Sequence, residues 1–271
     1  MRRRAQARGF TLVEVVVAMV VGAIVMIFAA MFLVAPIDAY EAHGLRSEMV
    51  ANTSTAWPRM EDDIRQALPN SVRARPNGNY VALELLQTCG YARYTTPPSA
   101  SFDVVGTASG VFGANCVNFT NIWLSVNNAG DEAYTQATSM TPRIPDLNPL
   151  MIPQATPGEA KLSLLMPINT NSPRNRIYLV ERPVTYLCDQ AQGTITRYAG
   201  YPIAALQVSR DTPAELAGSP SVEVVARGLT SCLFDVQRLG NLPEQVRVHL
   251  TSARGAEVVH LQYGASVENL P

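Results

Sequence analysis

An apolar segment near the N-terminus constrains the fold of this chain more than any other feature. No ionisable side chain occurs between Val15 and Ala35. A helix of about 21 residues is long enough to cross a hydrocarbon core of roughly 30 Å. The residues before it include four arginines: Arg2, Arg3, Arg4 and Arg8. Because basic residues beside a spanning segment favour the cytoplasm, the sequence predicts one transmembrane helix whose N-terminal end is cytoplasmic.

A single carboxylate, Glu14, lies at the start of the apolar segment. A charged side chain near the centre of a bilayer costs about 2.5–3.5 kcal/mol on insertion scales, and such residues are usually paired and functional. We therefore expect Glu14 to have a cationic partner.

The run Gly9-Phe10-Thr11-Leu12-Val13-Glu14, set between the basic leader and the apolar helix, resembles the processing motif of type IV prepilins and type II secretion pseudopilins. The resemblance implies that a membrane-embedded prepilin peptidase cuts between Gly9 and Phe10 and methylates the new amino group of Phe10. It also implies that Glu14 sets assembly register by pairing with the Phe10 ammonium of its own chain or of a neighbouring subunit.

Two simpler interpretations compete with this one. An ordinary signal peptide has a small-residue cleavage site after its apolar core, and residues 31–36 offer none that is convincing. In the second interpretation the segment is an uncleaved signal anchor, and Glu14 is incidental.

Composition and charge narrow the class of partner. Hydrophobic residues make up 47% of the 271 residues, enough for a folded core after the apolar segment. Loss of the four leader arginines would shift the formal net charge from −1 to about −5. An acidic chain with one lysine, Lys161, lacks the basic surface of a nucleic-acid-binding protein.

All four cysteines follow the apolar segment: Cys89, Cys116, Cys188 and Cys232. The predicted topology exposes them to an oxidising compartment, where disulfides persist. Three connectivities are possible. We favour Cys89–Cys116 with Cys188–Cys232, because each bridge then closes a contiguous piece of the chain. No CxxC spacing or nearby histidine suggests zinc, so no metal and no cofactor are expected.

The chain divides into four parts: a leader at 1–9, a transmembrane half-helix at 10–36, an amphipathic half-helix at 37–68 and a periplasmic head at 69–271. Pro36 is expected to interrupt the helix, and Thr53 to Thr55 to cap a fresh helical segment before Pro58. The helix has one apolar stripe, at Tyr40, Leu45, Met49, Ala56, Met60, Ile64 and Leu68. Glu61 and Arg65 should pair on the opposite face.

The head is predicted to be rich in loops up to Pro173 and to form antiparallel sheet from about Arg176. Three strand-like pieces recur in the first part: Tyr80–Leu86, Ile122–Val126 and Lys161–Met166. Alternating apolar residues predict a hairpin around the turn at 189–193, and a terminal hairpin around residues 252–255. The terminal hairpin should pack on the amphipathic helix, which gives an α+β fold of the type IV pilin kind.

Four short stretches resemble minor pilins of the mannose-sensitive haemagglutinin (MSHA) type IV pilus system: Ala67–Arg73, Tyr186–Asp189, Gly193–Tyr198 and Val267–Pro271. Chain length and the long insertion before the sheet are also similar to PilW-type minor pilins and to J-type pseudopilins. These resemblances imply a subunit that helps to initiate or cap a filament. The implied partners are major and other minor pilins, the prepilin peptidase, the inner-membrane assembly platform and membrane lipid.

Catalysis finds little support, because no nucleophile motif, phosphate-binding loop or HExxH is present. His249 and His260 lie on the two strands of the terminal hairpin, where facing histidines are usually inert. The acidic pairs Asp62-Asp63 and Asp131-Glu132 lack the spacing of a calcium loop and are predicted to be solvated surface charge.

Three functions from different classes therefore remain open. The favoured function is a structural subunit, not an enzyme, that is held in the bacterial inner membrane with a periplasmic head and is later part of a pilus at the cell surface. The alternatives are an adhesin-like head that recognises a glycan and an anchored periplasmic enzyme.

Overall fold

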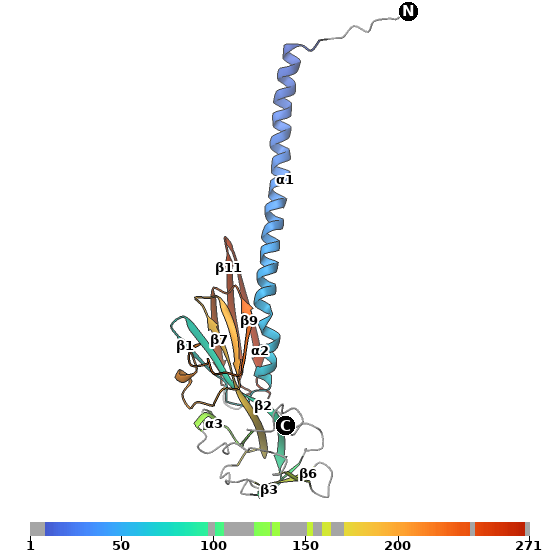
Figure 1. Ribbon diagram of the computed structural model, residues 1–271. Coiled ribbons are helices and arrows are strands. Elements are labelled where there is room, and N and C mark those ends of the chain that lie inside the picture. Colours follow the sequence, from blue (N-terminus) through green and yellow to red (C-terminus); the bar gives the residue numbers. More distant parts are fainter. Residues whose placement is uncertain are drawn as a thin grey trace, which may run out of the picture. The chain divides into compact units, whose positions relative to one another are not determined.

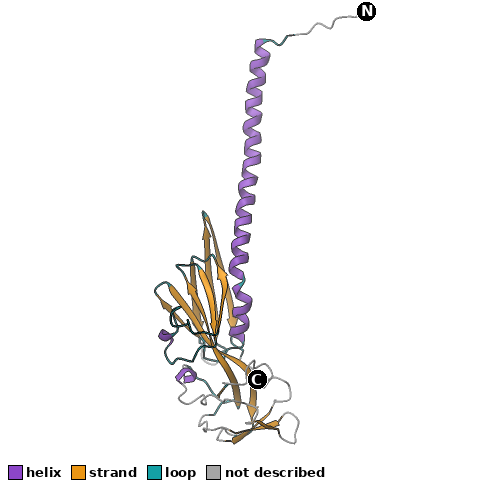
Figure 2. Cartoon of the chain, viewed as in Figure 1, coloured by secondary structure: helices purple, strands orange, loops and turns teal. Residues whose placement is uncertain are grey.

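The computed structural model describes residues 9–96, 101–105, 122–130, 132–135, 151–153, 159–163, 171–238 and 242–268. The chain forms two compact units, Met1–Glu48 and Met49–Pro271, and each is described by itself. Figures 1 and 2 show a long helix followed by two antiparallel sheets. The predicted α+β class is thereby confirmed.

The first unit contains helix α1 (Leu12–Ser54) as far as Glu48. The predicted interruption at Pro36 is wrong, because α1 continues through this residue. A proline removes one backbone hydrogen bond and strains its turn. The helix has about 24 residues before Pro36 and 18 after it, so the many intact hydrogen bonds on both sides allow the helix to persist.

The second helix, α2 (Ala56–Arg65), follows α1 after the single residue Thr55. The predicted cap is wrong, because Thr55 has helical dihedrals (φ −60°, ψ −29°) and makes no capping bond. Its hydroxyl instead lies 3.0 Å from the Asn52 carbonyl oxygen and 2.9 Å from that of Val225. Pro58 lies in the first turn of α2, where a missing N–H removes no intrahelical bond.

The predicted helix end at Leu68 is three residues too late. Ala67 forms an isolated antiparallel bridge with Gln87, and the Leu68 N–H donates to the Leu86 carbonyl oxygen at 2.8 Å. These sheet contacts take the backbone groups that another helical turn would need. The predicted Glu61–Arg65 pair forms at 2.6 Å, and Arg65 also lies 3.5 Å from Glu268.

The larger sheet has nine strands among the described residues, in the order β5-β6-β3-β2-β7-β8-β9, with β1 beside β2 and β4 beside β7. All of these neighbours are antiparallel. The strands are β1 (Arg73–Asn77), β2 (Tyr80–Tyr94), β3 (Ser101–Val105), β4 (Trp123–Ser125), β5 (Met151–Pro153), β6 (Glu159–Ser163), β7 (Arg176–Asp189), β8 (Thr194–Ala199) and β9 (Ser221–Arg227). Two short helices also occur, α3 (Glu132–Thr135) and η3 (Gln207–Ser209).

Strands β2 and β7 are the longest strands of this sheet, and they pair with each other from Tyr80↔Asp189 to Arg93↔Arg176. Register shifts at Gln87/Thr88 and Thr88/Gly90 divide the pairing into two halves. One half contributes Leu83 and Leu85 to the core that α2 covers. The other half contributes Ala92 and Tyr94 to a second core with β3, β4 and β6.

The predicted strand at Tyr80–Leu86 is therefore the first half of a strand twice as long. The expected loop-rich middle contains β1 to β6, of which β4 and β6 overlap the predicted pieces at Ile122–Val126 and Lys161–Met166. Short strands with interspersed proline carry weak local signals. Some of them also pair far along the chain, as Ser101 of β3 does with Ser163 of β6 and Trp123 of β4 with Val180 of β7.

The smaller sheet consists of β10 (Ser231–Gln237), β11 (Gln245–Arg254) and β12 (Glu257–Ser266). The last two strands are the predicted terminal hairpin, although its turn is tighter than predicted, since Arg254 still pairs with Glu257. Gly255 supplies the positive φ (62°) that the first position of a type II′ turn requires.

As predicted, the apolar face of this hairpin packs on α2. Met60 and Ile64 of α2 are fully buried in one cluster with Val248 and Leu250 of β11. Trp57 stacks on Tyr263 of β12 with ring centroids 4.7 Å apart. The main core therefore lies between the larger sheet, α2 and the smaller sheet.

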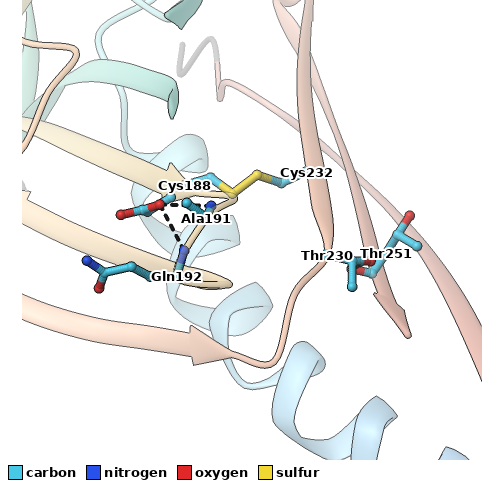
Figure 3. Close-up of a disulfide and its surroundings, with 7 residues drawn as sticks. Cys188, Ala191, Gln192, Thr230, Cys232 and Thr251 are labelled. Carbon is cyan, nitrogen blue, oxygen red and sulfur yellow. Dashed lines mark hydrogen bonds between the residues drawn. A yellow bond between two sulfur atoms is a disulfide. The ribbon is translucent and has the colours of Figure 1, made fainter. Parts of the chain in front are cut away.

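A disulfide between Cys188 and Cys232 joins β7 of the larger sheet to β10 of the smaller one (Figure 3). Both cysteines are buried, and their Cα atoms lie 6.6 Å apart. The turn next to Cys188 is stabilised by the Asp189 carboxylate, which accepts from the N–H groups of Ala191 and Gln192 at 3.0 Å each. A Cβ at Gly193 would lie 2.5 Å from the Leu229 carbonyl oxygen, so this turn requires glycine.

The prediction that Asp62 and Asp63 are both solvated is wrong for Asp63, which is 1% exposed. Its carboxylate lies 2.6 Å from Arg197 Nε on β8, and it accepts from the Tyr186 hydroxyl on β7 at 2.7 Å. Gln87 of β2 donates to the other oxygen at 3.1 Å. Helix α2 thus binds three strands of the larger sheet through one buried carboxylate.

The electrostatics of this cluster favour the ion pair. Burial raises the pKa of the Tyr186 phenol and the Asp63 carboxylate raises it further, so the hydroxyl remains a donor. Burial alone would lower the pKa of Arg197, but the hydrogen bond and the charge of Asp63 outweigh it and raise that pKa. Arg197 therefore stays charged beside Asp63.

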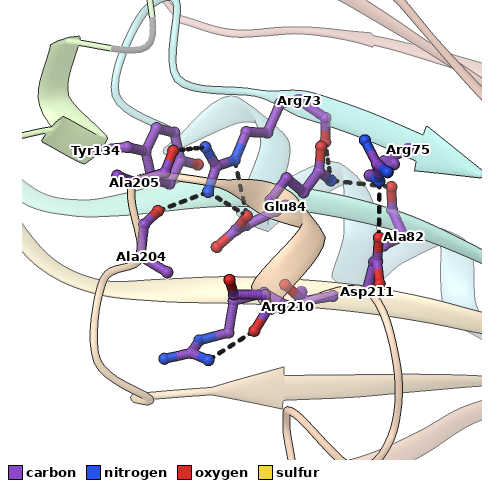
Figure 4. Close-up of polar contacts among 12 residues, drawn as sticks. Arg73, Arg75, Ala82, Glu84, Tyr134, Ala204, Ala205, Arg210 and Asp211 are labelled. Atoms are coloured by element: carbon purple, nitrogen blue, oxygen red, sulfur yellow. Dashed lines mark hydrogen bonds and ion pairs between the residues drawn. The ribbon is translucent and has the colours of Figure 1, made fainter.

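A second polar cluster holds the segment after β8 against β1 and β2 (Figure 4). Arg73 pairs with the fully buried Glu84 at 2.8 Å and donates to the carbonyl oxygens of Ala204 and Ala205 at 2.8 and 2.9 Å. Its guanidinium lies 3.5 Å from the centroid of the Tyr134 ring. Burial raises the pKa of Glu84, and the charge of Arg73 partly offsets that effect.

We expect a Cys188→Ala/Cys232→Ala variant to lose about 2–5 kcal/mol of the free energy of unfolding, because the bridge closes a loop of 44 residues in the unfolded chain. Urea unfolding of the full chain in detergent, followed by tryptophan fluorescence, measures this loss. Reductant added to the unfolded wild type should lower its stability at least to that of the variant, because it also breaks the disulfide of Cys89. A variant as stable as the oxidised wild type would contradict the prediction.

Asp63→Asn should cost about 3–5 kcal/mol, because it leaves the Arg197 charge buried without its counter-ion. The matched control is Asp62→Asn, the same change at the adjacent exposed position, which should stay within about 0.5 kcal/mol of wild type. The same urea experiment compares them. Equal effects of the two substitutions would show that the Asp63 contact does not stabilise the head.

Candidate processing and assembly site

The expected cleavage point lies immediately before α1, in residues that are neither helix nor strand. Gly9 and Phe10 are exposed, and Phe10 is 80% exposed. A Cβ built on Gly9 would have no described atom within 4 Å. An accessible backbone is what a peptidase needs at the bond that it cuts. The leader arginines lie outside the described residues.

Thr11 and Glu14 together begin α1. The Glu14 N–H donates to the Thr11 hydroxyl at 3.3 Å, and the Val15 N–H donates to the Thr11 carbonyl oxygen at the same distance. The spacing Thr-x-x-Glu is that of a capping box. A carboxylate in the first turn also interacts favourably with the helix dipole. Glu14 therefore has a local role in starting the helix, whatever it contacts in an assembly.

The surface that follows this start is apolar on all sides. Residues Leu12–Phe32 have a mean hydropathy of 2.9, and none of their side chains is buried in the structure. At 1.5 Å per residue this segment is about 31 Å long, which matches a hydrocarbon core. A buried core helix would be covered by the rest of the chain, so this helix needs lipid or other helices around it.

The remaining predicted sites are placed as follows. Cys89 is disulfide-bonded, and its expected partner Cys116 lies outside the described residues.

His249 stands opposite Gln262, and His260 opposite Thr251, so the two histidines are diagonal neighbours. The described residues contain no group of three or more His, Cys, Asp or Glu side chains able to hold a metal. The side chains of Asp131 and Glu132 lie outside the described part of the structure, so the prediction for this acidic pair stays a prediction.

Comparison with known proteins identifies the N-terminal segment only. A model of the prokaryotic N-terminal methylation motif matches residues 4–30. This segment contains Arg4 and Arg8 of the basic leader, Gly9, Phe10, Glu14 and most of the apolar helix. No curated protein and no solved structure matches the chain.

The motif and the exposed apolar helix indicate a class of protein. The chain is similar to type IV pilins and pseudopilins, which are structural subunits rather than enzymes. The motif implies processing by a prepilin peptidase and association with other pilins, and the helix indicates a single membrane anchor.

Sequence reasoning missed the buried cluster around Asp63, although one signal pointed to it. Arg197 occupies an inward position of β8 between Ile195 and Ala199, and all three are buried. A charged residue at an inward position predicts a buried partner of opposite charge. Nothing local shows that Asp63 rather than Asp62 is that partner.

Gly9→Val should block processing, because the peptidase must accept the residue before the cut, whereas the chain itself has room for a side chain there. Mass spectrometry of the protein from its native cell should show wild type without its first nine residues and with a methyl group on Phe10. The variant should keep its leader.

The matched control is Gly22→Val, a glycine in α1 that also has no described atom within 4 Å of a built Cβ. It should be processed like wild type. Normal processing of the Gly9 variant, or an intact leader on wild type, would contradict the proposed cleavage.

Proposed function

We propose that this protein is an MshO-like minor pilin of an MSHA-like type IV pilus, and that it takes part in initiation or tip assembly of the filament. The observation that carries the proposal is a methylation motif joined to an apolar helix that the rest of the chain leaves uncovered. The four short stretches that resemble minor pilins of the MSHA system support the subfamily.

Lateral packing of processed helices is the proposed mechanism. Cleavage after Gly9 would make Phe10 the first residue, with a cationic amino group four residues before Glu14. A carboxylate in lipid is costly, and an ammonium group nearby lowers that cost. Glu14 could reach the amino group of a neighbouring subunit only when the two helices lie at one relative height. The ion pair would therefore align adjacent helices as well as attract them.

The proposed topology follows from the basic leader and the cysteines. Arginines before the helix favour a cytoplasmic N-terminus. The Cys188–Cys232 disulfide suits a periplasmic head, because disulfides persist in oxidising compartments. In this proposal the inner membrane and its assembly platform receive the processed subunit, which then moves to the pilus at the cell surface.

The size of the head supports a position at the filament tip. Residues Met49–Pro271 hold two sheets and several cores. A subunit with so large a head is difficult to surround with neighbours on every side, and a tip position removes that requirement.

A J-type pseudopilin of type II secretion or a PilW-type minor pilin of a twitching pilus is the alternative within the same class. All of them share the motif, so the discriminating observation is the location of the protein. Antibody labelling should find it at the tips of purified pili or in trace amounts. Even labelling along the filament, or loss of protein secretion rather than pili on deletion, would contradict the proposal.

Glu14→Gln should be processed normally but should enter filaments about 10- to 100-fold less than wild type, because a charge-assisted contact worth about 1.5–3 kcal/mol is lost. The control is Glu41→Gln, a change of the same kind on α1 beyond the apolar span. Immunoblots of sheared pili and of membranes measure incorporation and processing separately. Normal incorporation of the Glu14 variant would refute the mechanism.

A further inference from the structure

A pocket of about 600 Å³ lies in the second unit where four segments meet. Its walls come from the segment after α2 at Asn70, the segment after β4 at Asn127, the segment before β7 at Arg174, and Leu242-Pro243. Cavities of this size are typical of small-molecule sites. The filament function proposed above does not use it.

The described residues that line this pocket carry positive charge only. Arg174 is exposed, whereas Arg176 is 7% exposed, and none of the described lining residues is acidic. In a chain of net negative charge, this is a local site of attraction for an anion. Guanidinium groups bind carboxylates through two parallel hydrogen bonds.

A third donor comes from Tyr178, two residues further along β7. It is 8% exposed, and its buried hydroxyl donates to no acceptor among the described residues. Burial raises the pKa of this hydroxyl, and the nearby Arg176 guanidinium lowers it. A buried hydroxyl whose hydrogen has no acceptor is uncommon in native proteins and is often explained by a water or a ligand.

Unfavourable backbone conformations concentrate at the same place. Among the described residues, the non-glycine residues with positive φ are Asn70, Asn127 and Asn175, at 63°, 56° and 54°. The first two line the pocket, and the third lies between Arg174 and Arg176. Left-handed conformations of non-glycine residues are sparsely populated, and they cluster at ligand-binding sites.

The walls of the pocket are fixed by hydrogen bonds between distant parts of the chain. The Asn70 side chain donates to the Asn128 carbonyl oxygen at 2.9 Å, and the Asn128 side chain donates to that of Pro69 at 3.0 Å. The Ser172 N–H donates to the Tyr94 hydroxyl at 2.6 Å. A site that is already ordered loses little conformational entropy when it binds.

We propose that this pocket binds an acidic sugar, a saccharide that carries one carboxylate. The two arginines would bind the carboxylate. The Tyr178 hydroxyl and the side chain of Asn127 would bind ring hydroxyls, and Pro173, Leu242 and Pro243 provide apolar surface for the C–H face of the ring. A small anion such as phosphate would use the arginines but leave the rest of the volume empty.

Isothermal titration calorimetry of the full-length protein in nanodiscs of zwitterionic lipid tests this proposal, with D-galacturonate as the probe. D-galactose is the matched neutral sugar. We expect saturable binding of galacturonate, with galactose at least about tenfold weaker, since one lost charge-assisted contact is worth about 1.4 kcal/mol or more.

Arg174→Gln should weaken galacturonate binding at least about tenfold, and because the residue is exposed the head should keep its fold. Arg227→Gln is the control, since it removes the same charge from an exposed position on β9 that does not line the pocket. Arg176→Lys keeps the charge but loses the two-pronged geometry, and it should also weaken binding. Circular dichroism confirms that each variant is folded.

Several outcomes would overturn the proposal. They are the absence of saturable binding, equal binding of galactose, and an Arg174 variant that binds like wild type. Inorganic phosphate that displaces galacturonate at equal concentration would show a general anion site instead. Tighter binding of an Asp-containing peptide would point to a protein partner. None of these results depends on cleavage at Gly9 or on Glu14, so the filament proposal is tested separately.

Discussion

The antiparallel pairing of β2 with β7 is the interaction on which the head depends. These two strands are 15 and 14 residues long, and every other strand of the larger sheet joins them directly or through one or two intervening strands. The register shifts near Thr88 divide their length, so that one half forms the core under α2 and the other half a separate core. A single pair of strands thus organises two cores, and the proposed sugar pocket lies beside the β7 half that begins at Arg176.

The helix and the smaller sheet are fastened to this framework by different kinds of contact. Apolar packing of Met60 and Ile64 against the terminal hairpin is non-directional, and it would tolerate small shifts of α2. The contact of Asp63 with Arg197 and Tyr186 is directional, and it fixes one position of α2 along the strands. The Cys188–Cys232 bridge covalently joins the two sheets that enclose the same core.

The N-terminal unit obeys a different constraint. Its helix satisfies its own backbone hydrogen bonds, but its apolar side chains have no cover within the chain. Such a surface is stable only in lipid or against other helices. The match to the methylation motif and the physical need for cover therefore agree on a membrane-anchored subunit that associates with others of its class.

The sequence by itself determined the features that depend on neighbours along the chain. The apolar span, the Thr11-to-Glu14 helix start, the Glu61–Arg65 pair and the terminal hairpin follow from helical spacing, capping and alternation over a few residues. The tertiary structure alone decided the second half of β2, the burial of Asp63 beside the exposed Asp62, and the grouping of Asn70, Asn127 and Arg174 around one pocket. These features arise from segments far apart in the chain, such as Asn70 and Asn128, which are 58 residues apart, and Asp63 and Arg197, which are 134 residues apart. No local pattern encodes which distant residue will supply the partner, because that choice is made by the packing of the whole domain.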